Sequence, residues 1–409
     1  MSLVLPFRTN EYVVEELIDW DRVPDDPMYQ LTFSQRGMLD PTDYAHVREL
    51  LRAKAPNEQI RAAADAIRRS LNPHPAGQMT DNVARLDGRP LPGMQHKYDE
   101  TVLFFPSQGQ TCHAYCTFCF RWAQFVGMAD LKMASRETAE LVRYLQRHPE
   151  VSDVLITGGD PMIMRANVLA GYIEPLLESK LESLHTIRIG TKSVGYWPQR
   201  FVTDPDADEV LRLFERVVAS GRQLALMAHY NHPVELSTPI AREALRRIRA
   251  TGAVVRMQSP LVRHINDDAQ AWADLWRTGA NLGAIPYYMF VERDTGARSY
   301  FEVPLVEAWE IFRDAYRQVS GLARTVRGPS MSAHPGKVRV VGVSTVNGRR
   351  VFVLEYLQAR DPEMVGRPFF AKFDSHATWF DQLEPAFPSD RALFHPAEAA
   401  EVEPLRVFG

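Results

Sequence analysis

The residues best suited to chemistry are the three cysteines of this 409-residue chain, which all fall within residues 110–121. Cys112, Cys116 and Cys119 follow the spacing C-x3-C-x2-C. Three is an odd number for a disulfide framework and one fewer than a closed four-cysteine metal site needs. Soft thiolates this close in sequence favour an iron–sulfur cluster, zinc or copper(I). A four-iron cluster held by three cysteines would leave one iron open for an outside ligand, as catalysis requires.

Two other interpretations of these cysteines are open. Cysteines often pack as small hydrophobic residues, although chance clustering of all three in one stretch would be unusual. His113 and the three thiols would also supply the nitrogen and sulfur ligands that zinc accepts. His113 lies between the first two cysteines, however, which is an awkward position from which to complete a tetrahedron.

The composition is that of an ordinary soluble globular protein. Apolar residues make up 45% of the chain, charged residues 24%, and the net charge is −4. This balance gives no sign of a nucleic-acid or membrane partner. No run of about 20 apolar residues occurs, and the N-terminus lacks the pattern of a signal peptide. Free thiols in a chain with few cysteines fit a reducing compartment, so we expect a cytoplasmic protein.

Short apolar runs that alternate with amphipathic segments predict a parallel α/β fold. The runs predict six strands, over residues 101–105, 154–157, 186–190, 224–228, 253–258 and 283–290. Five helices are predicted between them, over residues 135–146, 168–179, 207–220, 239–251 and 268–278. Strands joined by helices form parallel sheets with right-handed crossovers. We therefore expect a (β/α)6 partial TIM barrel with its site at the carboxyl ends of the strands.

Different patterns flank the predicted barrel. Helices are expected over residues 40–53 and 58–70, the second capped by Asn57. After a long helix over 305–320, two β-rich runs joined by Asn347-Gly348 predict a hairpin with a type I′ turn. We therefore divide the chain into an N-terminal helical and irregular segment (1–95), a barrel (96–303), a C-terminal helix, lysine loop and hairpin (304–360), and a proline-rich surface tail (361–409).

A second chemical motif follows the predicted strand at 154–157. Gly158 and Gly159 would let the backbone approach a ligand closely, and exposed backbone groups beside Asp160 could hold a charged amino acid moiety. Alone, such a turn is more often only a tight turn. Its position one strand after a three-cysteine loop favours ligand binding.

Together, the cysteine spacing, the aromatic Phe118 before the last cysteine and the Gly-Gly-Asp turn resemble the radical S-adenosylmethionine (SAM) enzymes. In that superfamily SAM binds the open iron of a [4Fe–4S] cluster, and reductive cleavage yields a 5′-deoxyadenosyl radical. The resemblance implies that the three cysteines hold the cluster and that an external flavodoxin or ferredoxin reduces it. It also implies that SAM is bound by Phe118, Gly158, Gly159, Asp160, His229 and Gln258.

Further short motifs resemble one branch, the lysine 2,3-aminomutase family. They occur in the family's order and comprise D-P-M-Y-Q-L (26–31), H-Y-N-H-P (229–233), Q-S (258–259), N-D (266–267), P-Y-Y (286–288) and P-G-K (335–337). Members of the family use pyridoxal 5′-phosphate (PLP) while a radical moves an amino group from Cα to Cβ. The resemblance implies that Lys337 carries PLP as the catalytic lysine, that Lys97 helps to bind it, and that Arg121 holds the substrate carboxylate.

The sequence also departs from this branch. Lysine-specific members surround the substrate ammonium with two aspartates, whereas the matching positions here are Arg293 and Ser330. A guanidinium would repel an ammonium, so we expect these residues to bind an acidic or polar side chain instead. Asp294 would restore a carboxylate if the loop shifted by one residue. Thr101 replaces one of two arginines that hold the PLP phosphate, and residues 332–334 replace a glycine run.

These observations predict a radical SAM, PLP-dependent amino acid 2,3-aminomutase that is homo-oligomeric and acts on a small amino acid other than lysine. An alternative is an enzyme of the same family that lacks PLP and abstracts hydrogen from another small molecule or from a protein lysine. A third hypothesis, from a different class, is a non-catalytic zinc or iron–sulfur binding protein.

Overall fold

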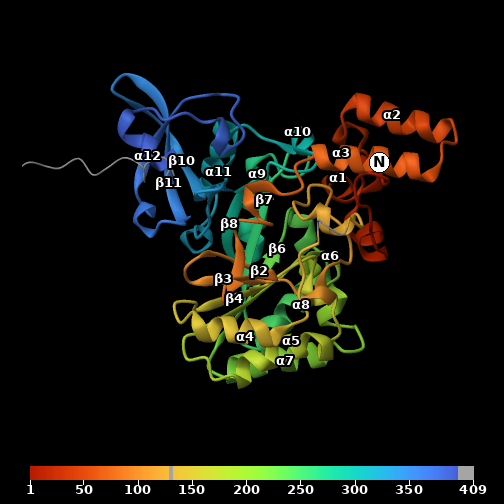
Figure 1. Ribbon diagram of the computed structural model, residues 1–409, viewed down its shortest axis with the longest axis vertical. Coiled ribbons are helices and arrows are strands. Elements are labelled where there is room, and N and C mark those ends of the chain that lie inside the picture. The colour runs from red at the N-terminus through yellow and green to blue at the C-terminus, as the bar shows by residue number, and fades with distance from the viewer. Residues whose placement is uncertain (129–131, 395–409) are drawn as a thin grey trace, which may run out of the picture.

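The computed structural model describes residues 1–128 and 132–394, and its strands form one continuous twelve-stranded sheet (Figure 1). The strands lie in sequence order, and those from β3 to β9 run parallel to one another. They are β3 (Thr101–Phe104), β4 (Asp153–Ile156), β5 (Thr186–Thr191), β6 (Gln223–His229), β7 (Val254–Leu261), β8 (Ile285–Val291) and β9 (Arg327–Ser332). Antiparallel strands extend both edges. The expected α/β fold with a parallel partial barrel is confirmed.

Helices cross between the parallel strands and cover the outside of the sheet. They are α4 (Thr138–Arg147), α5 (Ala166–Glu178), α7 (Ala207–Ala219), α8 (Pro239–Ala250), α9 (Ala269–Asn281) and α11 (Leu305–Arg317). Because side chains alternate along a strand, Ile187 and Ile189 of β5 are fully buried in the main core with Ile173 of α5. The intervening β5 side chains face the inside of the barrel.

The ends of two helices show how local sequence sets their limits. The Thr238 hydroxyl accepts a hydrogen bond from Ala241 N at 3.2 Å and caps α8, with Pro239 in the first turn. The predicted Asn57 cap was wrong. The helix α3 (Asn57–Ser70) begins at Asn57 itself, Pro56 holds the cap position, and no side chain caps the helix.

The N-terminal 95 residues contain more strand than the sequence predicted. Besides α1 (Pro27–Thr32), α2 (Pro41–Arg52) and α3, this region forms a hairpin of β1 (Val83–Leu86) and β2 (Arg89–Tyr98). Asp87 and Gly88 join the two strands with φ angles of 51° and 78°, which suits a type I′ turn. The hairpin pairs with β3 and so extends one edge of the barrel sheet.

The C-terminal region extends the other edge. The predicted hairpin is present as β10 (Gly336–Val346) and β11 (Arg349–Ala359), and Asn347 and Gly348 at its turn both have positive φ angles. The expected surface tail instead adds the strand β12 (Pro368–Lys372) and buries Phe369, Phe380 and Phe394 in a separate core. Residues 395–409 lie outside the described part of the chain.

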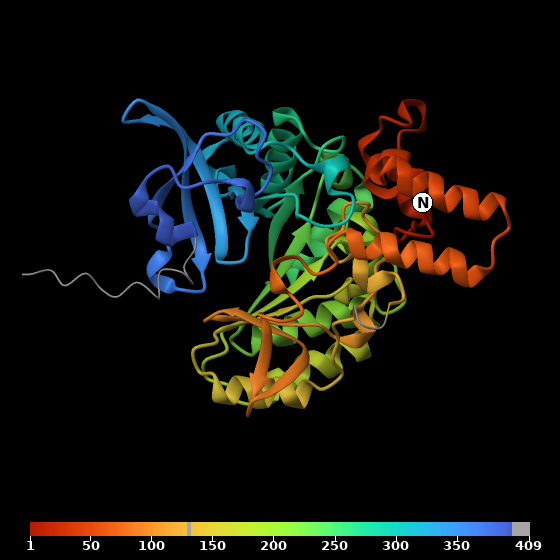
Figure 2. The same ribbon diagram turned by 45° about the horizontal axis from the view of Figure 1, so that its top comes forward.

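The N-terminal helices and the C-terminal strands flank the barrel on opposite sides (Figures 1 and 2). Each side has its own buried cluster, distinct from the main core between the barrel strands and their helices. In the described residues, no helix is long and apolar enough to cross a membrane.

Candidate active site

A cavity of about 420 Å³ lies inside the barrel toward the carboxyl ends of the parallel strands. The cysteine loop (residues 110–121) and Lys337 of the C-terminal hairpin both reach it. The other predicted site residues that line it are Phe118, Arg121, Gly158, Gly159, His229, Gln258, Lys97 and Arg293. The fold therefore brings residues from every region except the tail to one space.

Two predicted site residues do not line the cavity. Ser330 is fully buried inside β9, and its hydroxyl lies 3.5 Å from the carbonyl oxygen of Met289. Asp160 is 1% exposed and accepts hydrogen bonds from the backbone N–H groups of Met162, Lys192 and Ser193. The Asp160 carboxylate therefore holds the end of β5 against the Gly-Gly-Asp turn. The contacts of Ser330 with substrate and of Asp160 with SAM stay predictions.

The loop after β8 keeps the register that puts Arg293 at the cavity. The Asp294 backbone carbonyl accepts a hydrogen bond from Asn72 Nδ2 at 2.6 Å, away from the cavity lining. The next residue, Thr295, accepts a hydrogen bond from Trp122 Nε1 at 2.9 Å and donates to the Asn72 carbonyl. The shift that would exchange Arg293 for Asp294 is therefore absent.

The cysteine loop is held from one side by the N-terminal segment. The backbone N–H of Thr117 donates to the carbonyl of Leu31, and its hydroxyl donates to the carbonyl of Gln30 at 2.8 Å. Both acceptors belong to α1, within the D-P-M-Y-Q-L motif. Tyr115 N donates to the carbonyl of Arg8 in the same way. The motif thus supports the loop that carries the thiols.

From the other side, the loop lies against Gly158 and Gly159. A Cβ atom on Gly159 would fall 2.5 Å from Thr111 N and 2.6 Å from Thr111 O. Asp160 N also donates to the Thr111 carbonyl at 2.7 Å. The glycines are thus required for backbone packing against the cysteine loop, in addition to any contact with a ligand.

The three thiols supply the type of ligand that iron–sulfur clusters use. All three thiols are free and line the cavity. Within the described residues, no three His, Cys, Asp or Glu side chains are close enough together to hold one metal ion. His113 is also engaged elsewhere, because its Nδ1 lies 3.0 Å from Ser193 Oγ and its ring stacks on Trp197. Iron–sulfur clusters use thiolate ligands and spread them over several metal atoms.

Burial raises the pKa of each of the three thiols, that of Cys119 to about 12. The negative charge of neighbouring cysteines adds to the effect at Cys112 and Cys119. Three thiolates without a bound cation would be unfavourable in free energy at this buried site. Bound metal would have to compensate their charge, since ligation requires deprotonated sulfur.

His229 and Gln258 form a pair at the ends of β6 and β7. Their Nε2 atoms lie 3.0 Å apart, and both side chains line the cavity. Burial, reinforced by the positive charges of Lys192 and Arg121, lowers the pKa of His229 to about 3. The imidazole is therefore neutral at physiological pH and is suited to hydrogen bonding rather than to proton transfer.

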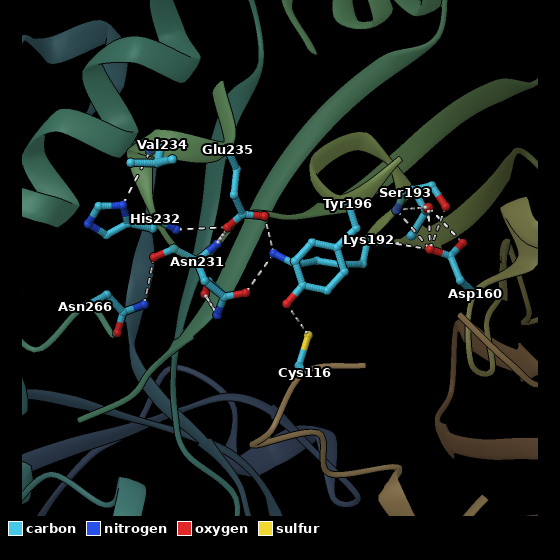
Figure 3. A network of polar contacts seen from close by, with 12 residues as sticks. Cys116, Asp160, Lys192, Ser193, Tyr196, Asn231, His232, Val234, Glu235 and Asn266 are labelled. Atoms are coloured by element: carbon cyan, nitrogen blue, oxygen red, sulfur yellow. Dashed lines mark hydrogen bonds and ion pairs between the residues drawn. The ribbon is translucent and has the colours of Figure 1, made fainter. Parts of the chain in front are cut away.

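A buried polar network follows the ends of β5 and β6 (Figure 3). Lys192 Nζ donates to Asn231 Oδ1 at 2.9 Å and also pairs with Glu235, which is fully buried. The Glu235 carboxylate accepts the backbone N–H of Asn231 at 2.6 Å. Asn231 thus belongs to this network, while His229 of the same H-Y-N-H-P motif faces the cavity. Tyr196 lies beside Lys192, and its hydroxyl is 3.4 Å from Cys116 Sγ.

Lys337 lines the same cavity as the thiols. Its amine donates to Gln358 Oε1 at 3.0 Å and lies 4.3 Å from the centre of the Tyr288 ring. Burial, with the positive charges of Arg188, Arg327 and Lys97, lowers its pKa to about 7. A large fraction of the amine is therefore uncharged and nucleophilic near neutral pH.

A group of cations surrounds Lys337. Burial also lowers the pKa of Lys97 to about 7, and its amine donates to the carbonyl of Ala333 at 2.6 Å. Arg188 pairs with Asp153 and brings its guanidinium within 3.5 Å of Thr101 Oγ1. Sequence reasoning missed Arg188. The strand β4 lies between β3 and β5, and the Arg188 side chain reaches across it to the threonine that replaces the expected arginine. Only strand register could have indicated this.

Two further arginines, Arg121 and Arg293, line the cavity. The Arg121 guanidinium lies 4.4 Å from the centre of the Phe105 ring and has no hydrogen bond or ion pair within the described residues. Arg293 stacks near Phe120 and leaves a buried Nε donor without a hydrogen-bond partner. Glu292, a missed residue at the end of β8, also lines the cavity, and burial raises its pKa well above the usual range.

Comparison with known proteins identifies the family. No family model matches the chain. However, the chain is 31% identical over 375 residues to an Aquifex aeolicus protein named "Putative L-lysine 2,3-aminomutase", and the match covers 92% of this chain and 87% of the relative. The chain belongs to the radical SAM lysine 2,3-aminomutase family.

Other members of the family are more distant. The L-lysine 2,3-aminomutase of Haemophilus influenzae is 29% identical over 62% of this chain and 72% of its own length. That of Clostridium subterminale is 26% identical over 70% of this chain and 62% of its own length. Among solved structures, a radical SAM methyltransferase from Sphaerobacter thermophilus matches 69% of this chain and 92% of its own, at 14% identity and a TM-score of 0.40.

As a member of this family, the protein is an enzyme of the aminomutase-like radical SAM isomerase type. Enzymes of the radical SAM type use SAM and a [4Fe–4S] cluster, and the three thiols at the open cavity fit such a cluster.

Proposed function

We propose that the enzyme is a PLP-dependent amino acid 2,3-aminomutase that acts on an acidic or polar amino acid. The observation that carries the proposal is that the three thiols and Lys337 line the same cavity. A radical generated at SAM would thus lie within one enclosed space with a substrate amine held near Lys337.

The surroundings of Lys337 fit PLP. The amine is partly deprotonated near neutral pH, as a lysine that bonds to an aldehyde must be. The surroundings of Lys337 have a positive field, which suits a phosphate and comes from Lys97, Arg188 and Arg327. Only Arg188 among them has a carboxylate partner in the described residues, so the charge of the other two is not neutralised by an acid. We assign the phosphate to Lys97 and Arg188, which line the cavity. When bound, PLP would spread the unpaired electron during migration of the amino group.

The two arginines that line the cavity, Arg121 and Arg293, support an anionic substrate. Arg121 is well placed for the α-carboxylate, because its guanidinium is held by aromatic rings and not by an acid. Arg293 Nε lies 3.9 Å from Asp294 Oδ1 but donates no hydrogen bond in the described residues, so this buried donor remains for a side-chain carboxylate or amide oxygen. Neighbouring Glu292 would be a hydrogen-bond donor when protonated. A lysine side chain would meet repulsion here.

The proposal is tested by trapping PLP on the protein. The enzyme is reconstituted anaerobically with iron and sulfide, incubated with PLP, reduced with borohydride and mapped by mass spectrometry. We expect the adduct at Lys337, its loss in Lys337→Arg and its retention in Lys180→Arg, a change at an exposed lysine far from the cavity. Absence of an adduct in the wild type would leave only the PLP-free alternative.

The substrate class is tested separately. The reduced enzyme with SAM is incubated with each proteinogenic amino acid, and 5′-deoxyadenosine and β-amino products are measured. Glutamate, glutamine, aspartate or asparagine is expected to give product. Product from lysine alone would contradict the assignment of Arg293 while leaving PLP dependence intact.

A further inference from the structure

Tyr196 contacts a cluster ligand from the protein side. Its hydroxyl oxygen lies 3.4 Å from Cys116 Sγ, and the ring is 1% exposed. Cys116 lines the cavity but Tyr196 does not. The tyrosine therefore approaches the sulfur from behind and leaves the open side of the sulfur free for iron.

Several contacts fix the position of this ring. Tyr196 ends the short helix α6 (Ser193–Tyr196), and its carbonyl accepts a hydrogen bond from Asn10 Nδ2 at 3.0 Å. The Lys192 ammonium lies 4.5 Å from the ring centre and is itself held by Asn231 and Glu235 (Figure 3). A Cβ on Gly195 would fall 2.3 Å from Glu235 Oε2, so the backbone before Tyr196 is packed tightly against this network.

The direction of the hydrogen bond follows from the state of the sulfur. A cysteine that ligates iron is a thiolate and has no proton to donate. A phenol keeps its proton at neutral pH, since its ordinary pKa is about 10. In the assembled enzyme the Tyr196 hydroxyl is thus the donor and Cys116 Sγ the acceptor.

We propose that this hydrogen bond from Tyr196 raises the reduction potential of the cluster. Reduction adds one electron from a low-potential donor to the cluster, and the added charge spreads onto its sulfur ligands. A donor aimed at one of these sulfurs stabilises the reduced state more than the oxidised state. The inference rests on the cluster and requires neither PLP nor the proposed substrate. Tyr196 is a positioning residue that acts through Cys116.

The test is a redox titration followed by electron paramagnetic resonance. Reconstituted wild type is compared with Tyr196→Phe and with Tyr12→Phe, in the absence of SAM, PLP and amino acid. Tyr12 is a matched control, because it is buried in the same core and its hydroxyl lies 2.7 Å from Thr238 Oγ1 with no cysteine partner. We expect Tyr196→Phe to lower the ratio of reduced to oxidised cluster roughly tenfold at a fixed potential, or about 59 mV for one electron. Tyr12→Phe should match the wild type.

A second variant separates hydrogen bonding from packing. Replacement of Tyr196 by 3-fluorotyrosine keeps the ring and hydroxyl but makes the phenol a stronger donor. The potential should then rise, opposite to the shift in Tyr196→Phe, whereas a purely structural disturbance would not reverse its sign. An unchanged potential in both variants would overturn the proposal. If the Tyr196→Phe variant does not assemble a cluster, the fluorotyrosine protein alone decides. An unchanged or lower reduction potential in that protein would overturn the proposal.

Discussion

The amine of Lys337 must lose its proton before it can react with an aldehyde, and its surroundings favour that loss. Burial and three neighbouring cations lower its pKa to about 7, while a single neutral acceptor, Gln358 Oε1, remains for the protonated form. A solvated lysine with a pKa near 10.4 would be almost fully charged at pH 7. The cavity therefore prepares the residue for reaction with an aldehyde, as the proposed binding of PLP requires.

This pKa predicts the pH dependence of PLP binding. The uncharged fraction of Lys337 rises as pH increases through about 7, so the rate of adduct formation should increase roughly tenfold from pH 6 to pH 8 and then level off. The rate can be followed by absorbance or by borohydride trapping at timed intervals. A rate that continues to climb through pH 10 would show that the amine has an ordinary pKa.

Arg293 is expected to determine which substrates bind. Replacing it with glutamine removes a charge-assisted hydrogen bond worth about 1.5–3 kcal/mol, so KM for an acidic amino acid should rise roughly 10- to 100-fold. Arg165→Gln, a change at an exposed arginine outside the cavity, is the control and should leave KM unchanged. Equal effects of both changes, measured by product formation, would remove Arg293 from the substrate site.

The cysteine loop depends on elements on both of its sides, α1 and the Gly158-Gly159 turn. Neither support is apparent from the cysteine spacing alone. In the sequence, the D-P-M-Y-Q-L motif indicates only a family resemblance. Its role in supporting the cysteine loop follows from the hydrogen bonds between α1 and Thr117. The loop therefore depends on residues about 90 positions earlier and about 40 positions later in the sequence.

Gly159→Ala should prevent the loop from holding a cluster. The new Cβ would lie 2.5 Å from the backbone nitrogen of Thr111, and a backbone atom cannot rotate away. We expect the iron bound per chain to fall severalfold after anaerobic reconstitution. Gly171→Ala on α5 is the control, since a Cβ there meets nothing within 4 Å. Full iron loading of Gly159→Ala would mean that the loop can shift.

The buried pair at the ends of β5 and β6 should affect stability. Glu235→Ala leaves the Lys192 ammonium buried without its carboxylate, and loss of one partner of a buried pair typically costs about 3–5 kcal/mol. Denaturant unfolding of the apoprotein measures the effect. The double variant with Lys192→Met should recover part of the loss. No recovery would indicate that packing around Glu235 matters more than charge.

The sequence predicted the barrel strands because each is a buried apolar run, and their limits moved by only a few residues. It did not predict β9, since Gly328, Pro329 and two serines give no apolar pattern. It also missed the β1–β2 hairpin, although Asp87-Gly88 is a turn pattern that could have indicated it. Side chains such as Arg188 and Glu292 could not be found because they reach the cavity through strand pairing and not through a motif.

The cysteine loop and the strand that carries Lys337 belong to different buried clusters of the molecule. Phe118 and Ala114 of the cysteine loop pack in the N-terminal core, whereas the strands around Lys337 pack in the C-terminal core. The described part of the tail completes the second core, where Tyr356 stacks on Phe369 and donates to the carbonyl of Leu393.

Truncation after residue 360 should therefore affect the cysteine loop and Lys337 differently. It removes β12 and exposes Phe352, Leu354 and Tyr356, which are fully buried in the intact chain. We expect loss of the PLP adduct at Lys337 but near-normal iron loading and cluster absorption. Loss of iron to the same degree as loss of the adduct would show that the two cores do not form independently.

The position of β10 at the far edge of the sheet has a consequence for biosynthesis. A growing polypeptide completes the cysteine loop and strands β3 to β8 well before it reaches Lys337, whereas β9, the strand with which β10 pairs, ends at Ser332 just before the hairpin. Iron and sulfide delivered during translation would meet the thiols in a cavity that still lacks β10, whereas the proposed PLP could bond to Lys337 only after β10 has been added.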